Sequence, residues 1–359
     1  MRRSRLLAAG IMGGAVALVL AGCAPAPSSE GGGGSTSDPG ASEYCARMVT
    51  NSGGLEDRSF NQSSWAGLQQ AQEEFGIDAQ VLVSTGETDL APNVTQAVDS
   101  GCTFVLTVGY ELADATLEEA GDHPDTHFAI VDETVDAPNV KPIVFDTAQA
   151  SYLAGYLAAG VSKTGVVATF GGGNQPPVTL FMDGFVDGVA KYNEVHGTQV
   201  RTLGWDKATQ DGVFTGDFED INKGKTVTQG FLDQGADVIL PVAGQVGEGA
   251  ASAVLESGTA SLIWVDNDGY ETLPAEYRSV VLTSVLKNTG DAVVQIVGDD
   301  IDGEFSADPY IGTLENQGVA LAPFHDLEAS VPAELRTEIE GLEAQIIDGT
   351  IVVESPSAP

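Results

Sequence analysis

Short apolar segments alternate with amphipathic segments along most of this chain, and this alternation limits its fold more than any other feature. Residues 61–75 have a helical pattern in which Trp65, Leu68 and Phe75 share one stripe. The strand-like segments of the first part lie at 45–50, 79–83, 103–108, 127–131 and 141–145. Strands that alternate with helices form parallel sheets covered by helices on both faces. The sequence therefore predicts an α/β fold.

The same pattern then begins again, which predicts a second α/β lobe. An apolar helix over 151–161 comes first. The strand-like segments that follow it lie at 165–170, 199–203, 236–240 and 261–265. A strand at 279–285 and a helix at about 289–301 fit, by their length, as a return into the first lobe. An amphipathic helix over 330–348 comes last.

We expect the two lobes to share the chain in pieces. The first lobe is predicted to hold 43–147 and about 268–305, and the second lobe 148–267 and about 306–359. Each change of lobe gives one connection between them. Two lobes joined by several connections can close on a ligand by hinge bending.

The first 23 residues have the three-part form of a secretory signal peptide. Arginines at positions 2, 3 and 5 give a positive start, and an uncharged run over 6–20 follows. The segment ends in Leu20-Ala21-Gly22-Cys23, which resembles a lipobox, where cleavage leaves a lipid-modified Cys23 as the new N-terminus. An ordinary signal peptide with an incidental Cys23 is the alternative. We expect residues 1–23 to be a lipoprotein signal and Cys23 to anchor the protein on the extracytoplasmic face of the cell membrane.

Residues 24–42 follow the predicted signal and have almost no apolar bulk. They are mainly glycine, serine, proline and alanine, with four consecutive glycines at 31–34. This composition is typical of a flexible tether. Such a tether lets a globular body move above the membrane while it stays attached.

The body of the chain is strongly acidic. Removal of the signal takes three of the 15 Lys and Arg, which leaves 12 against 52 Asp and Glu, a formal charge of −40. A surface of this charge repels nucleic acid and anionic lipid. We therefore expect no nucleic-acid partner and no membrane contact besides the lipid anchor.

Two cysteines remain after the signal, Cys45 and Cys102, and each opens a strand-like segment. If these segments are neighbouring parallel strands, both cysteines lie at the same end of the sheet. A disulfide requires α-carbons within about 7 Å, which adjacent strands supply, and an extracytoplasmic compartment is oxidising. We expect a Cys45–Cys102 disulfide, with free thiols on buried strands as the alternative.

The motifs for cofactor binding and catalysis are incomplete in this chain. Gly171-Gly172-Gly173 follows a strand but lacks the full dinucleotide-binding pattern. Gly224-Lys225-Thr226 resembles the end of a P-loop, but Glu219 stands where the first glycine is required. The four histidines are scattered, without a partner at metal-ligand spacing. We expect no cofactor, no metal and no enzymatic activity.

Polar side chains follow several predicted strands at their carboxyl ends, where open α/β sheets bind ligands. The first strand leads into Asn51 and a glycine-rich turn, and the next helix begins near Phe60 and Asn61. An aromatic ring beside an amide suits stacking on, and hydrogen bonding to, a flat heterocycle. Further strand ends with glycine, carboxylate or lysine residues lie at 241–247, 264–268 and 282–287. Together these segments predict one ligand site.

These segments resemble the basic membrane protein family, whose members include purine nucleoside receptor lipoproteins of ABC transporters. The resemblance runs over nearly the whole body of the chain. It includes Asn51-Ser52-Gly53-Gly54, Ser59-Phe60-Asn61-Gln62, Phe181-Met182-Asp183-Gly184-Phe185, Pro241-Val242-Ala243-Gly244, Val265-Asp266 and Thr283-Ser284-Val285-Leu286-Lys287. The family implies a two-lobed periplasmic-binding-protein fold (type I), in which each lobe is a parallel sheet flanked by helices and the ligand lies in the cleft between the lobes. It also implies an ABC permease and ATPase as partners, and we expect a monomer.

The resemblance implies a role for five residues by their position. Phe60 stacks on the base, and Asn61 forms a hydrogen bond near it. Asp266 accepts hydrogen bonds from the ribose hydroxyls, and Lys287 donates on the ribose side. Gly244 lets its loop approach the ligand closely. Base stacking contributes roughly 1–3 kcal/mol per base.

The family pattern leaves one part of the base site open, and this chain departs from it in another. The second aromatic wall of the base site is one of Tyr110, Phe181 and Phe218. The family usually has aspartate where this chain has Asn51. An ionised carboxylate only accepts hydrogen bonds, whereas an amide donates as well as accepts. We therefore expect the base preference to differ from that of the purine receptors.

The main expectation is a lipoprotein that captures nucleosides, purine nucleosides first, and delivers them to an ABC permease. A binding protein for another small ligand, such as a sugar or a signalling molecule, is the first alternative, and Asn51 keeps it open. A nucleoside hydrolase is the second, although it would need a carboxylate or metal cluster that we do not find. A lipoprotein that senses ligand for a signalling partner has the same sequence features as a transport component.

Overall fold

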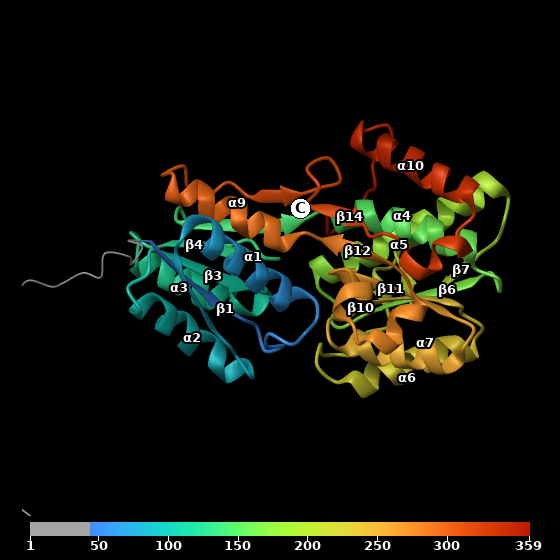
Figure 1. The fold of residues 1–359 in the computed structure, drawn as a ribbon, viewed down its shortest axis with the longest axis horizontal. Helices are drawn as coiled ribbons and strands as arrows, with labels where there is room; N and C mark the ends of the chain where they lie inside the picture. The colour runs from blue at the N-terminus through green and yellow to red at the C-terminus, as the bar shows by residue number, and fades with distance from the viewer. Residues whose placement is uncertain (1–43) are drawn as a thin grey trace, which may run out of the picture. The chain divides into compact units, whose positions relative to one another are not determined.

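The structure, a computed structural model, describes residues 44–359. The predicted signal peptide, its Cys23 and the predicted tether at 24–42 lie outside the described residues. Two six-stranded sheets, each flanked by helices, form two α/β lobes (Figure 1). Within residues 44–359, no helix has both the length and the apolar character needed to cross a membrane.

The first sheet is entirely parallel. In spatial order its strands are β13 (Tyr310–Gly312), β5 (Val140–Phe145), β4 (His127–Val131), β3 (Phe104–Val108), β1 (Cys45–Val49) and β2 (Asp78–Leu82). The central strands β1, β3 and β4 are almost continuously apolar and buried. This burial on both faces is what parallel sheets require.

Helices cover both faces of the first sheet. They are α1 (Phe60–Phe75), α2 (Glu87–Asp99), η1 (Tyr110–Leu112), α3 (Ala113–Asp122) and α9 (Thr289–Ile301). Helix α9 comes from much later in the chain and packs beside α1 (Figure 1). Helices α2 and α3 pack together over a separate apolar cluster that includes Leu90, Val105 and Phe128.

The second sheet is parallel except for one edge strand. In spatial order its strands are β14 (Val319–Leu321), β12 (Val281–Lys287), β11 (Ser261–Asp266), β10 (Val238–Val242), β6 (Val166–Gly171) and β7 (Arg201–Leu203). Only β14 runs antiparallel to its neighbour, β12. A two-stranded ribbon of β8 (Trp205–Asp206) and β9 (Asp211–Gly212) lies outside this sheet.

The helices of the second lobe include one that is apolar on every side. They are α4 (Thr147–Val161), α5 (Pro176–His196), α6 (Ile221–Asp233), α7 (Val246–Ser257), α8 (Gly269–Thr272), η2 (Ala275–Val280), η3 (His325–Ser330) and α10 (Ala333–Ile347). Helix α4 is buried along almost its whole length and packs tightly against α5. Glycines allow this approach: a Cβ on Gly188 would lie 1.9 Å from the carbonyl oxygen of Tyr152.

The predicted division into lobes was wrong at two places. The strand predicted at 279–285 is β12, and it pairs with β11 in the second sheet instead of returning to the first lobe. Only short helical turns separate β11 from β12, and they suffice to bring the chain back parallel to the strand it has just left. Strand β13, predicted in the second lobe, pairs with β5 in the first sheet. The helix predicted at about 289–301 is α9 and lies in the first lobe.

Three segments connect the lobes: 145–147, 287–289 and 312–319. These segments are hydrogen bonded to one another. The backbone N–H of Asp146 donates to the carbonyl of Gly312 at 2.8 Å, and the N–H of Asn288 donates to Gly318 at 2.9 Å. The connections therefore form one structural unit between the two sheets.

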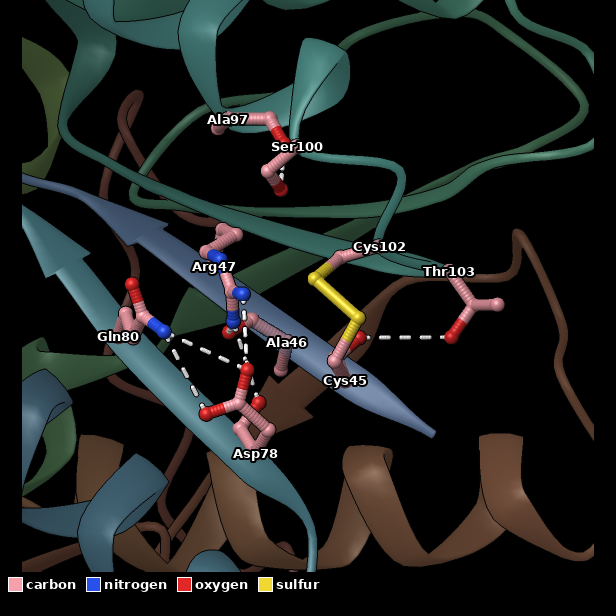
Figure 2. Close-up of a disulfide and its surroundings, with 9 residues drawn as sticks. All are labelled: Cys45, Ala46, Arg47, Asp78, Gln80, Ala97, Ser100, Cys102 and Thr103. Carbon is pink, nitrogen blue, oxygen red and sulfur yellow. Dashed lines mark hydrogen bonds and ion pairs between the residues drawn. A yellow bond between two sulfur atoms is a disulfide. The ribbon is translucent and has the colours of Figure 1, made fainter. Parts of the chain in front are cut away.

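A disulfide joins Cys45 to Cys102, with their α-carbons 5.0 Å apart (Figure 2). Cys45 begins β1, and Cys102 lies two residues before β3, its parallel neighbour. The two cysteines lie at the amino end of both strands, as expected from the sequence. Arg47 on the same strand is buried and forms an ion pair with Asp78 at 2.8 Å (Figure 2).

Candidate functional site

A cavity lies where strands of both sheets reach their carboxyl ends. It encloses about 700 Å³ of space, part of it open to solvent. Six of the seven predicted ligand-binding residues line this cavity: Asn51, Phe60, Tyr110, Gly244, Asp266 and Lys287. The site was expected at strand ends because parallel strands bring their carboxyl ends to one edge of a sheet.

The seventh predicted residue, Asn61, is buried behind the cavity wall. Its amide nitrogen donates to Asn51 Oδ1 at 2.6 Å and to Asp57 Oδ2 at 3.1 Å. An amide nitrogen has two hydrogens, so both are used within the protein. In this arrangement Asn61 holds Asn51 in place, and its predicted hydrogen bond near the base stays a prediction.

Asp57 lines the cavity and fixes the start of helix α1. Its carboxylate accepts the backbone N–H groups of Ser59 and Gln62 at 3.1 Å and of Asn61 at 2.6 Å. These groups have no partner within a helix, so a carboxylate at this end satisfies them. Burial raises the pKa of Asp57 to about 6, although the three N–H donors act in the opposite direction.

Among residues 44–359, Lys287 is the only lysine that lines the cavity, and it is almost completely buried. Its ammonium lies 2.5 Å from Asp132 Oδ2 and 3.5 Å from Asp266 Oδ1. Burial alone lowers the pKa of Lys287, but the two carboxylates outweigh this effect and raise it above its usual range. Lys287 therefore stays charged in the folded protein.

The same ammonium faces an aromatic ring. Lys287 Nζ lies 4.6 Å from the centre of the Phe60 ring, within the distance at which cations and aromatic faces attract. It also lies 5.8 Å from the centre of the Phe181 ring. One buried cation thus connects the carboxylates of the cavity to its aromatic wall.

Asp266, the last residue of β11, and Asp132, which directly follows β4, both have a left-handed backbone conformation. Their φ angles are 65° and 62°, which residues with side chains rarely adopt. The side chain of Asp266 is also held in place, because its Oδ2 accepts a hydrogen bond from the Ser59 hydroxyl. Strain of this kind clusters at functional sites, where the surroundings hold it in place.

The loop before α1 joins the first lobe to the second. Arg58 forms an ion pair with Glu248 at 3.2 Å and donates to the carbonyl of Thr272 at 3.1 Å. The side-chain amide of Asn267 donates to the carbonyl of Ser59 at 2.9 Å. Opening of the cleft must break these contacts.

All three candidates for the second aromatic wall line the cavity: Tyr110, Phe181 and Phe218. Tyr110 comes from the first lobe, and its hydroxyl accepts a hydrogen bond from Gln175 of the second lobe at 2.9 Å. Phe218 lies beside Gly244, whose φ of 52° explains the glycine there. Aromatic rings from both lobes therefore border the same space.

Five polar residues that line the cavity were not among the predicted ligand-binding residues: Asp57, Glu111, Asp132, Gln175 and Gln245. Asp132 directly follows β4, and Glu111 lies three residues after β3. The rule that predicted Asp266 applies equally to these two positions, so strand ends alone could have found them. Among residues 44–359, no group of three or more His, Cys, Asp or Glu is placed to hold a metal ion.

Residues 46–356 match the family described as ABC transporter substrate-binding protein PnrA-like (Bmp). The chain belongs to this family. As a PnrA-like substrate-binding protein, it binds a ligand and works with an ABC permease outside the cytoplasm.

Relatives within the PnrA-like family extend over almost the whole chain. An ABC transporter nucleoside-binding protein BmpA of Lactococcus lactis is 30% identical over 371 residues, covering 98% of this chain and 99% of that protein. Basic membrane protein A of Borreliella burgdorferi is 27% identical, covering 84% of this chain and 86% of that protein. The predicted basic membrane protein resemblance is confirmed.

Solved structures show the same fold. A solute-binding protein of an ABC transporter from Aeropyrum pernix superposes with a TM-score of 0.77 at 23% identity, covering 86% of this chain and 92% of that one. One from Conexibacter woesei gives a TM-score of 0.68 at 21% identity, covering 87% and 99%. The PnrA-like chain therefore has the predicted two-lobed periplasmic-binding-protein fold (type I).

Proposed function

We propose that this protein captures nucleosides, purine nucleosides first, and delivers them to an ABC permease without chemical change. The observation that carries the proposal is the contact of Lys287 with both the Phe60 ring and the Asp266 carboxylate. A flat base needs an aromatic face, and a ribose needs charged hydrogen-bonding groups beside that face. This cavity offers both within one cluster.

Phe60 is the proposed stacking surface for the base. It begins α1, whose start is fixed by Asp57, so the ring has a defined position. Phe181 and Phe218 border the cavity from the second lobe. A base held between aromatic rings from the two lobes would favour their closure around it.

Asp266 and Lys287 are the proposed ribose-binding pair. A carboxylate accepts from hydroxyl groups, and an ammonium donates to their oxygens. In this structure Asp266 accepts from the Ser59 hydroxyl, a group with the same chemistry as a ribose hydroxyl. The relative from Lactococcus lactis carries the name of a nucleoside-binding protein, which supports the same ligand class.

Attachment through Cys23 is also part of the proposal. A lipid-anchored body would stay beside the permease, and the predicted tether would leave it free to turn. This part rests on the lipobox at 20–23 and on the extracytoplasmic location of the family.

The decisive test is calorimetric titration of residues 43–359 with adenosine, guanosine, inosine, uridine and thymidine. The protein should first be unfolded and refolded to remove any ligand carried through purification. Binding of one nucleoside with a stoichiometry near one, and no binding of free ribose, is the expected result. Refolded protein that binds none of the five would contradict the proposal and direct the search to sugars.

A further inference from the structure

Glu111 has an unused carboxylate oxygen in the cavity. It lies on η1, just after β3, and lines the cavity beside Asn51. Its Oε2 is buried, yet no group of residues 44–359 gives this atom a hydrogen bond. A buried acceptor without a donor is costly, so such groups in native proteins call for a partner.

Asn51 lies next to this oxygen and has only its N–H groups to offer. Its Oδ1 accepts from Gly53 N at 3.0 Å and from Asn61 Nδ2 at 2.6 Å, which uses both lone pairs. The backbone N–H of Gly53 can only donate, so the atom that faces it must be the oxygen. The N–H groups of the Asn51 amide are therefore the part of this side chain that remains for a ligand.

The two groups meet over Gly109, at the end of β3. A Cβ placed on Gly109 would lie 2.7 Å from Glu111 Oε2 and 3.2 Å from Asn51 Nδ2. One point of the cavity wall is thus in reach of an acceptor and a donor. Burial raises the pKa of Glu111, whereas its own backbone N–H and the nearby Asn51 amide, which makes no hydrogen bond to Oε2, lower it.

We propose that Glu111 and Asn51 together read the hydrogen-bonding edge of the base, and that Glu111 selects guanosine over adenosine. This inference rests on the proposed nucleoside-binding function. Guanine presents two N–H donors side by side, on N1 and the N2 amino group, next to the O6 acceptor. A carboxylate can accept from both donors while the Asn51 amide donates to O6.

Adenine fits this pair less well. Its N1 carries a lone pair instead of a hydrogen, which repels a carboxylate, and its edge has one amino group. Inosine keeps O6 and the N1 hydrogen but lacks the N2 amino group. The expected order of affinity is therefore guanosine, inosine, adenosine. Glu111, and not Asn51, sets this order of affinity, because the acceptor oxygen of Asn51 is already used by Asn61 and Gly53.

The test is calorimetric titration of the wild-type protein and of Glu111→Gln with the three purine nucleosides. The wild type should bind guanosine about tenfold or more tightly than adenosine. Glu111→Gln should lose about tenfold or more for guanosine and change little for adenosine, because glutamine replaces one acceptor oxygen with a donor. Glu87→Gln is the matched control. Glu87 is exposed and does not line the cavity, but its charge raises the pKa of Glu111, so the variant removes a nearby negative charge without removing an acceptor from the cavity.

A second measurement avoids any dependence on a folded variant. The wild-type protein should bind 1-methylguanosine about tenfold or more weakly than guanosine, because the methyl group removes the N1 hydrogen. Nucleoside binding with an unchanged guanosine-to-adenosine ratio in Glu111→Gln would overturn the inference and leave the proposed function standing. A wild-type preference for adenosine would do the same. Absence of all nucleoside binding would overturn both.

Discussion

The ammonium of Lys287 lies 2.5 Å from the carboxylate of Asp132, and this ion pair joins strand β12 of one sheet to the end of β4 in the other. The pair lines the cavity, and both side chains are nearly inaccessible to solvent. The same contact therefore contributes to the candidate ligand site and connects the two lobes.

Lys287→Met should lower the free energy of unfolding by about 3–5 kcal/mol, because it leaves two buried carboxylates without their cation. Equilibrium unfolding in urea measures this change. Lys163→Met is the control, since Lys163 is exposed and its loss should change stability by less than about 0.5 kcal/mol. Equal effects of the two variants would show that the cluster around Lys287 adds no stability.

Phe60→Ala should weaken nucleoside binding by about tenfold or more without unfolding the protein, because stacking on an aromatic ring contributes roughly 1–3 kcal/mol. Calorimetry gives the affinity, and circular dichroism gives the fold. Phe75→Ala serves as the control, because Phe75 ends the same helix and is 37% exposed. Unchanged affinity in Phe60→Ala would remove this ring from the base site.

Asp266→Ala should weaken inosine binding by about 1.5–3 kcal/mol, the contribution of hydrogen bonds to a charged group. Hypoxanthine, which lacks ribose, should be affected much less by the same substitution. The comparison of the two ligands isolates the ribose contact. A similar loss for both would mean that Asp266 acts on the base or on the closure of the lobes.

The pH dependence of stability should contain a contribution from Asp57. Its pKa is about 6 in the folded protein and 3.8 in the unfolded reference, so the folded state binds more protons between these values. The contribution of Asp57 to the free energy of unfolding should therefore rise as the pH falls from 7 towards 4. The difference in unfolding free energy between wild type and Asp57→Asn measures it, and a difference that stays constant over this range would contradict the expectation.

Cys23→Ser should release the protein from the membrane, because the lipid would have no attachment point. Fractionation of cells into membrane and soluble material, followed by detection of the protein, tests this. Cys45→Ser with Cys102→Ser is a suitable control, since these cysteines are joined in the folded body and should not affect anchoring. Retention of Cys23→Ser in the membrane would exclude the predicted lipobox.

The strand ends were the part of the site that sequence could predict best. Phe60, Asp266 and Lys287 come from separate parts of the chain, yet parallel strands bring them to one cavity. The rule concerns where a strand ends, so it applies before any contact is known. Asp132 and Glu111 follow the same rule, although the sequence analysis did not single them out.

Contacts between side chains were harder to predict. Asn61 has the right residue type and position for a ligand contact, but its donors are used by Asn51 and Asp57. Whether these hydrogen bonds form depends on differences of a few tenths of an ångström across a turn. The spacing of residues in the sequence does not give such distances. The prediction that β12 belongs to the first lobe was wrong for a similar reason, because the length and apolar character of this strand suit either sheet.

The three connections between the lobes set the order in which the protein can be completed during synthesis. The first sheet lacks its edge strand until β13 has been made. The second sheet gains β12 before that point but lacks its own edge strand until β14 has been made. Until residue 312 has emerged from the ribosome, β5 has an open edge and neither sheet is whole. Every residue that lines the cavity has been made once Lys287 is added, yet at that point each sheet still lacks an edge strand.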